Sequence, residues 1–147
     1  MGREIVEQLL KAVRERLALL EQYNTPAFAG WERDPVRVAA AEHFLQVAIQ
    51  AVIDICAHMT SERGLNGDAT YATVVRRWAD VFASPPDLAQ ALAKMVGFRN
   101  VLVHEYGDVN VSQLALVVSS HLGDFHRFIA HVLQTEMFRS TDKKHNA

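Results

Sequence analysis

A long apolar stretch decides the fold: residues 35–61 read PVRVAAAEHFLQVAIQAVIDICAHMTS. Its start is typical of a helix, because the Asp34 carboxylate can cap the first N–H groups and Pro35 suits the first helical position. Apolar residues follow it in two rows at helical spacing, Val38, Leu45, Val52 and Met59 in one and Phe44, Ala48, Ala51 and Ile55 in the other. A helix that is apolar over much of its circumference is buried, so we expect this one at the centre of a helical bundle.

Shorter helical patterns flank this central segment. Before it, one apolar stripe predicts a helix that ends near Tyr23, with the residues Ile5, Leu9, Val13, Leu17 and Leu20. After it, we expect a helix over 71–82, and another that begins at the prolines with Ser84 as its cap and ends at Gly107 and Asp108. A last helix follows an Asn110–Gln113 capping box and reaches about residue 138. The sequence therefore predicts an all-α fold, an antiparallel up-and-down bundle of four to five helices.

The composition describes an ordinary globular chain of 147 residues, which predicts one domain over 1–138 and a charged, flexible tail over 139–147. The net charge of −2 excludes a uniformly basic surface, so any contact with RNA has to be local. The single cysteine, Cys56, cannot form an intramolecular disulfide. Because no secretion signal and no unbroken apolar span is found, we expect a soluble, cytoplasmic protein with no membrane contact.

The polar residues that could do chemistry gather in residues 97–110, GFRNVLVHEYGDVN. No glycine-rich phosphate loop and no motif of the common hydrolases occurs elsewhere. At about 100° per residue, Arg99 and His104 lie about 140° apart on one helix, which makes it awkward to aim both at a single phosphate. A second copy could supply the missing partner, since a two-fold axis would bring two arginines and two histidines into one cleft. The sequence therefore predicts a homodimer.

The same residues resemble a known family. Arg99, His104 and Tyr106 match the Arg-x4-His-x-Tyr signature of the HepT branch of the HEPN superfamily. The context is similar in order and spacing, in the segments LQVAIQAVIDICAHM (45–59), GLNGDATYATVVRRWADVF (64–82) and LAKMVGFRNVLVHEYGDVN (92–110). The resemblance covers most of the chain.

This resemblance implies an all-helical, homodimeric toxin that cleaves RNA without a metal and is encoded beside a minimal nucleotidyltransferase (MNT) antitoxin. It makes Arg99 and His104 the catalytic pair and Asn100 the accompanying polar residue. It makes Tyr106 the hydroxyl that the antitoxin adenylylates. A histidine with a pKa near 6.5 can exchange protons with the ribose oxygens while arginine stabilises the phosphate, so no metal or other cofactor is expected.

Simpler interpretations stay open beside this one. An arginine on a helix surface and a histidine near a helix C-terminus are often structural, and Tyr106 could be an amphipathic residue at a helix end. In that case the protein is a non-catalytic helical partner or substrate subunit of a nucleotidyltransferase. The net acidity favours this alternative, because RNA-binding enzymes tend to be basic.

Two other groups of residues are candidates for sites. Asp54 and His58 share a face of the central helix, and a structural hydrogen bond between them is favoured over a metal site. Arg76 and Arg77 beside Trp78 could form a basic patch with an aromatic, although an exposed pair is the simpler interpretation. Four further histidines show no spacing that completes a zinc site: His43, His121, His126 and His131.

Overall fold

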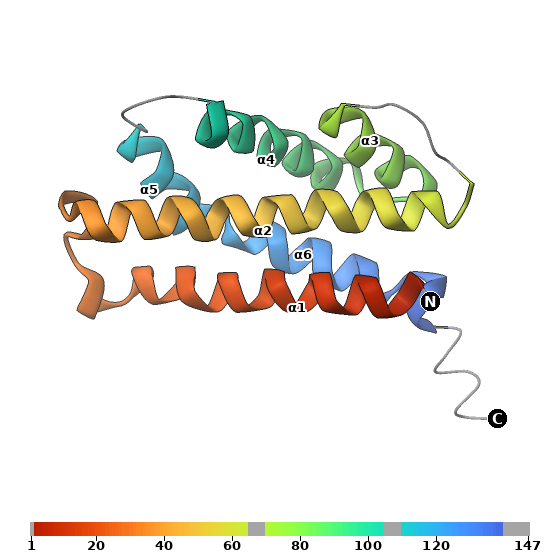
Figure 1. The fold of residues 1–147 in the computed structure, drawn as a ribbon, viewed down its shortest axis with the longest axis horizontal. Coiled ribbons are helices and arrows are strands. Elements are labelled where there is room, and N and C mark those ends of the chain that lie inside the picture. The colour runs from red at the N-terminus through yellow and green to blue at the C-terminus, as the bar shows by residue number, and fades with distance from the viewer. Residues whose placement is uncertain (1, 65–69, 105–109, 140–147) are drawn as a thin grey trace.

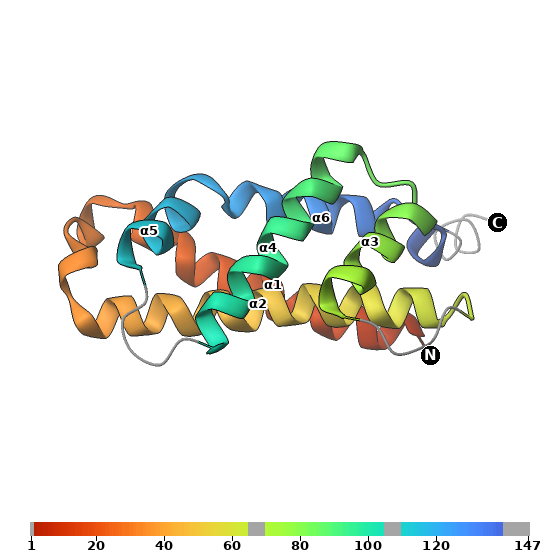
Figure 2. The ribbon, with the colours of Figure 1, turned by 90° about the horizontal axis from the view of Figure 1, so that it is seen from above.

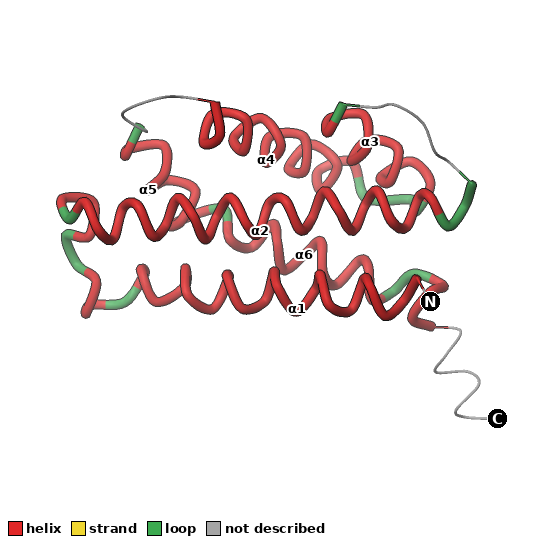
Figure 3. The backbone as a smooth tube through the Cα atoms, viewed as in Figure 1, coloured by secondary structure: helices red, strands yellow, loops and turns green. Residues whose placement is uncertain are grey.

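The computed structural model of the chain describes residues 2–64, 70–104 and 110–139. All regular secondary structure in these ranges is helical (Figure 3), so the all-α prediction is confirmed. The long elements in chain order are α1 (Gly2–Glu21), α2 (Pro35–Ser61), α3 (Tyr71–Val81), α4 (Pro86–His104), α5 (Val111–Ser120) and α6 (Leu122–Leu133). Short 3-10 helices connect α1 to α2, at Gln22–Asn24, Pro26–Phe28 and Trp31–Arg33. The tail residues 140–147 and the helix end expected at 107–108 lie outside the described residues.

α2 is the central helix and has the predicted bounds. The Asp34 carboxylate accepts a hydrogen bond from the amide of Val36 at 3.0 Å, which caps the helix as expected. The helix contacts α1, α3, α4 and α5, and both predicted rows supply buried residues. By length and composition alone α2 could cross a membrane. The core helix of a soluble bundle passes the same test, and the packing of α2 on several sides is that of such a helix.

The remaining helices are arranged around α1 and α2 (Figure 1). α1 and α2 run antiparallel alongside each other, and α6 lies behind them. α3, α4 and α5 lie on the other side of α2 from α1. Seen from above, α4 runs diagonally across the molecule between α2 and α6 (Figure 2). This crossing leaves the C-terminal end of α4 at the surface of the bundle.

α1 buries a stripe that differs from the predicted one by one position at its start. Ile5 is 45% exposed, whereas its neighbour Val6 is fully buried. Both stripes satisfy a helical period, and they merge at the third member, so spacing alone could not choose between them. The buried stripe consists of Val6, Leu10, Val13, Leu17 and Leu20.

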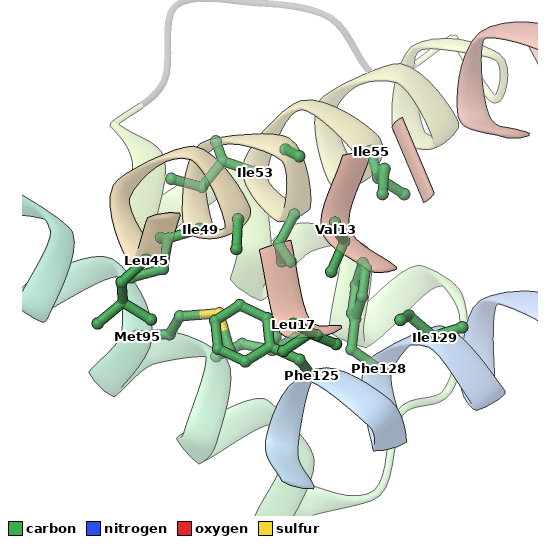
Figure 4. Close-up of a cluster of buried hydrophobic side chains, with 14 of the residues drawn as sticks. Val13, Leu17, Leu45, Ile49, Ile53, Ile55, Met95, Phe125, Phe128 and Ile129 are labelled. Atoms are coloured by element: carbon green, nitrogen blue, oxygen red, sulfur yellow. The ribbon is translucent and has the colours of Figure 1, made fainter. Parts of the chain in front are cut away.

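The core is formed where α1, α2, α4 and α6 meet (Figure 4). Phe125 and Phe128 of α6 are almost completely buried there, and Met95 of α4 packs beside Leu45 of α2. Burial of this apolar surface is the main term that stabilises the fold. It also fixes the inward face of α4, and with it the direction in which the polar residues at the end of α4 lie.

The last predicted helix is wrong as a single element, because the chain bends at His121 between α5 and α6. The predicted cap is present, since the Asn110 side chain accepts a hydrogen bond from the Gln113 amide at 3.1 Å. Two consecutive serines before the bend and Gly123 after it are weak helix formers, which lowers the cost of the break. A further helical turn at 136–139 buries Phe138.

The junction between α3 and α4 differs from its prediction in one detail. α4 begins at Pro86, so Pro85 precedes the helix and its carbonyl accepts the amide of Ala89 at 3.0 Å. The Ser84 hydroxyl donates to the Pro85 carbonyl at 3.2 Å, so Ser84 is not the cap of α4. Its amide instead donates to the Ala79 carbonyl at 2.9 Å, which closes the C-terminal end of α3.

Candidate active site on helix α4

Three of the four predicted site residues, Arg99, Asn100 and His104, lie in the last turns of α4. Arg99 is partly buried and Asn100 is exposed, one residue further along the helix. His104 is the last residue of α4, and its side chain lies outside the described part of the structure. Tyr106 also lies outside the described residues. The structure therefore places Arg99 and Asn100 in full and His104 by its backbone.

Arg99 is turned towards α3 because the inward face of α4 is occupied by apolar residues. The face towards the core carries Leu88, Leu92, Met95 and Val96, all buried. On the α3 side, the guanidinium carbon of Arg99 lies over the ring of Tyr71, 4.8 Å from its centre. A cation at this distance from an aromatic face is attracted by the negative charge of the ring face. Tyr71 is 39% exposed, so this contact is at the protein surface.

A groove lies along another side of α4 and has a volume of about 500 Å³. It is bounded by α2, α5 and α6 as well as α4, and Arg99 is not among its lining residues. The lining is largely apolar, and Leu116 within it is 55% exposed. The residues of α4 that line the groove are Asp87, Gln90, Ala91, Lys94, Met95, Gly97, Phe98 and Val101.

The helical register relates this groove to position 104. His104 follows Gly97 by seven residues, which is about two turns, so the two positions share one line along α4. Gly97 lines the groove, whereas Arg99 contacts Tyr71 on the other side. By this register, position 104 lies on the groove side of α4, and Arg99 lies on the side of α3.

The expected pair of Asp54 and His58 is wrong. The Asp54 carboxylate accepts a hydrogen bond from the Gln50 side chain at 2.9 Å, and His58 Nε2 lies 3.7 Å from the Glu62 carboxylate. Each residue is four positions from the side chain that it contacts. Gln50 and Glu62 have long side chains at this spacing, and they contact Asp54 and His58 in place of the expected pair. Asp54 is exposed and does not orient the imidazole.

The histidines of α6 have structural partners. His126 Nε2 lies 2.5 Å from the Glu21 carboxylate, and His131 Nε2 lies 2.7 Å from the Phe82 carbonyl oxygen. His121 is 3.5 Å from Asp124, at the start of the helix. Within 2–64, 70–104 and 110–139, no group of three or more metal-binding side chains gathers.

The basic patch considered at Arg76 and Arg77 loses its aromatic member. Trp78 is fully buried and packs on Phe128, with ring centres 4.9 Å apart. It cannot stack on a base, so the arginines form the simple surface pair that was the alternative.

Tyr71 is the residue that sequence reasoning missed, because it lies outside the motif. Pro85 stands midway between Tyr71 and Arg99 in the sequence. Two helices that fold back on each other around that proline bring equidistant residues together, so this symmetry was the available signal.

A comparison with known families identifies the family of the chain. The model of the family described as ribonuclease HepT-like matches residues 13–132. The chain belongs to the ribonuclease HepT-like family. The match includes the central helix and the whole of the Arg99 to Tyr106 motif, so the resemblance predicted from the sequence is confirmed.

Curated relatives in this family are named as nucleases. The chain is 33% identical to the mRNA nuclease HepT of Shewanella oneidensis over 87 residues, which are 58% of this chain and 64% of that protein. It is 25% identical to the tRNA nuclease HepT of Aphanizomenon flos-aquae over 128 residues, 87% of each protein. The match to the Shewanella protein thus spans less than two thirds of its length.

A solved structure has the same fold. The chain superposes with a TM-score of 0.80 on the tri-AMPylated Shewanella oneidensis HEPN toxin, whose structure was determined in complex with an MNT antitoxin. The superposition covers 89% of this chain and 98% of that toxin, at 24% identity. The fold of the chain is therefore that of a HEPN toxin.

Proposed function

We propose that the protein is the toxin of a toxin–antitoxin pair and acts in the cytoplasm as a metal-independent endoribonuclease. The observation that carries this proposal is the sequence motif of Arg99, His104 and Tyr106, which begins in the last turns of α4 and lies within the family match. The nuclease names of two relatives support it. Arg99 is at the surface of the bundle and outside its core, where an RNA phosphate can reach it.

The reaction that fits these residues is transesterification. An imidazole of His104 takes the proton of a ribose 2′-hydroxyl, and the 2′-oxygen attacks the adjacent phosphorus. The bond from phosphorus to the 5′-oxygen breaks, and an imidazolium returns a proton to that oxygen. Arg99 stabilises the charge on the pentavalent phosphate. The products are a 2′,3′-cyclic phosphate and a 5′-hydroxyl, and DNA is not a substrate because it lacks the 2′-oxygen.

The separation of Arg99 from position 104 supports an active site shared by two copies. The groove beside Gly97 and Val101 has a mainly apolar lining with charged residues such as Lys94 and Asp124 in it, and it leaves Leu116 exposed, which suits a contact surface for a second copy. Arg99 lies on the other side of α4 from this groove, so the two-fold axis has to pass near the C-terminal end of α4 to bring both copies of Arg99 and His104 to one cleft.

Control by an antitoxin completes the proposal. A solved relative was AMPylated and bound to an MNT antitoxin. By this analogy an MNT-type nucleotidyltransferase adenylylates Tyr106 and blocks the cleft. The alternative function is a non-catalytic partner of such a nucleotidyltransferase, which the net charge of −2 favours.

RNA cleavage by the purified protein tests the proposal. We expect cleavage that persists in EDTA and leaves 2′,3′-cyclic phosphate ends, and we expect Arg99→Ala and His104→Ala to abolish it. Arg14→Ala and His43→Ala are matched controls, since both residues are exposed on other helices, and they should keep full activity. Abolition by EDTA, or equal activity of all four variants, would contradict the assignment. Modification of the protein without any cleavage would favour the alternative.

A further inference from the structure

The contact between Tyr71 and Arg99 joins two helices at the candidate active site. The guanidinium carbon of Arg99 lies 4.8 Å from the ring centre of Tyr71, the first residue of α3. Because an arginine side chain has several rotatable bonds, a guanidinium at the surface is mobile unless something holds it. The ring of Tyr71 restricts this motion from one side.

Among the described residues, no hydrogen bond or ion pair to Arg99 is found. Its Nε is buried and has no hydrogen-bond partner there. A cation–π contact uses the face of the guanidinium and none of its N–H donors. The ring can therefore position Arg99 while the terminal nitrogens remain available for phosphate oxygens, which an ion pair with a carboxylate would not allow.

Tyr71 is itself held in place by the start of α3. Thr70 caps this helix, since its Oγ1 accepts the amide of Thr73 at 3.2 Å. Further along α3, Trp78 is fully buried in the core. The backbone that carries the Tyr71 ring is thus fixed at both ends, while the ring remains 39% exposed beside the site.

We propose that Tyr71 is a positioning residue, whose ring orients the Arg99 guanidinium towards the phosphate of the RNA. This inference rests on the proposed ribonuclease function. The ring performs this role and the hydroxyl is not needed. Tyr71→Phe should therefore keep Arg99 oriented, and Tyr71→Leu should not. The role also requires the guanidinium, so a substitution of Tyr71 should not change RNA binding further in a variant that lacks Arg99.

Binding of an RNA that cannot be cleaved, because its 2′-oxygens are methylated, tests the coupling. Tyr71→Leu should weaken this binding by about two- to fivefold, the range of a surface cation–π contact, and Tyr71→Phe should restore it. In the Arg99→Ala background, Tyr71→Leu should change nothing further. An equal loss in both backgrounds, or a loss with Tyr71→Phe as large as with Tyr71→Leu, would overturn the proposal.

The NMR resonance of the Arg99 Nε–H group supplies a readout that is independent of RNA. The wild type and Tyr71→Phe should show the ring-current shift of a proton above an aromatic face, and Tyr71→Leu should lose it while the far-ultraviolet circular dichroism is unchanged. An identical resonance in wild type and Tyr71→Leu would refute the positioning role. If the shift is present but the wild type neither binds nor cleaves RNA, the contact between Tyr71 and Arg99 exists and the proposed ribonuclease function is wrong. The role of Tyr71 towards RNA then fails with that function.

Discussion

The indole N–H of Trp78 donates a hydrogen bond to the sulfur of Met59, with Nε1 and Sδ 3.4 Å apart. This bond joins α3 to α2, and the contact of Trp78 with Phe128 joins α3 to α6. Tyr71 lies about two turns away on the same helix. The ring beneath Arg99 therefore depends on a buried tryptophan that takes no direct part in the site.

Trp78→Ala should reduce the free energy of unfolding by about 3 to 5 kcal/mol, because it leaves a large cavity at a fully buried position. Urea denaturation checks this value. Val36→Ala is the control, since Val36 is 77% exposed, and it should change the free energy by about 0.5 kcal/mol or less. A loss below about 1 kcal/mol for Trp78→Ala would show that α3 does not depend on this side chain.

Ala83→Gly should stabilise the protein by up to about 1 kcal/mol, because Ala83 has a φ of 53° after the end of α3. This left-handed conformation is costly for a residue with a Cβ atom and free of that cost for glycine. The same substitution at Ala57, exposed within α2, should instead destabilise by about 1 kcal/mol. Thermal unfolding of the two variants should show shifts of opposite sign, and a lower melting temperature for both would contradict the backbone geometry at Ala83.

The sequence predicted the parts of the fold that depend on local chemistry. Residues 35–61 have an apolar pattern over much of the helix circumference and follow a capping residue, and α2 has the expected bounds. The bend at His121 was missed because the apolar spacing continues through it from Val118 to Phe125, and both residues are buried on either side of the bend. Periodicity reports which residues are buried, and a bend that preserves burial leaves no signal in it.

The site was predictable where it depends on residue order along one helix. The spacing of Arg99 and His104 is enough to determine their angular separation. The contact of Arg99 with Tyr71 depends on how α3 packs against α4. The partners of Asp54 and His58 depend on which of the side chains four positions away along the chain makes the contact. Both are decided by three-dimensional packing and side-chain length, which a one-dimensional pattern does not contain.

Cys56 should react slowly with thiol reagents in the folded protein. It is fully buried in α2, and burial raises the pKa of its thiol well above the usual value. A raised pKa lowers the fraction of reactive thiolate at any pH below it, and burial also blocks access. Labelling with Ellman's reagent at pH 8 should require unfolding in guanidinium, and rapid stoichiometric labelling of the native protein would contradict the buried position.

Leu116→Arg should convert the expected homodimer to a monomer and lower RNA cleavage. Leu116 is 55% exposed in the groove beside α4, so a charged side chain there opposes burial against a second copy. The monomer should stay folded, with an unfolding free energy within about 0.5 kcal/mol of the wild type. Sedimentation of Val36→Arg, a charge placed at another exposed apolar position, should still show a dimer. A wild type that is monomeric at micromolar concentration would refute the dimer, and a dimeric Leu116→Arg would refute this interface.

Incubation with a cognate MNT-type nucleotidyltransferase, ATP and Mg²⁺ should add AMP to Tyr106 and abolish RNA cleavage. Each AMP brings about one negative charge and a nucleoside to a cleft that must accept a phosphate, so repulsion and occlusion act in the same direction. Tyr106→Phe should resist modification, because phenylalanine keeps the ring and removes the acceptor oxygen. Mass spectrometry of the modified peptides, together with an RNA cleavage assay, checks both effects.

Tyr71→Phe is the matched control for this modification. Tyr71 is an exposed tyrosine that contacts Arg99 near the end of α4, but it lies outside the motif, so its variant should accept AMP at Tyr106 as the wild type does. AMP found on Tyr71 would show that exposure beside Arg99, and not the motif, selects the acceptor. Full RNA cleavage after stoichiometric modification of Tyr106 would show that the antitoxin acts by occupying the cleft itself, since the added charge and bulk would then be without effect.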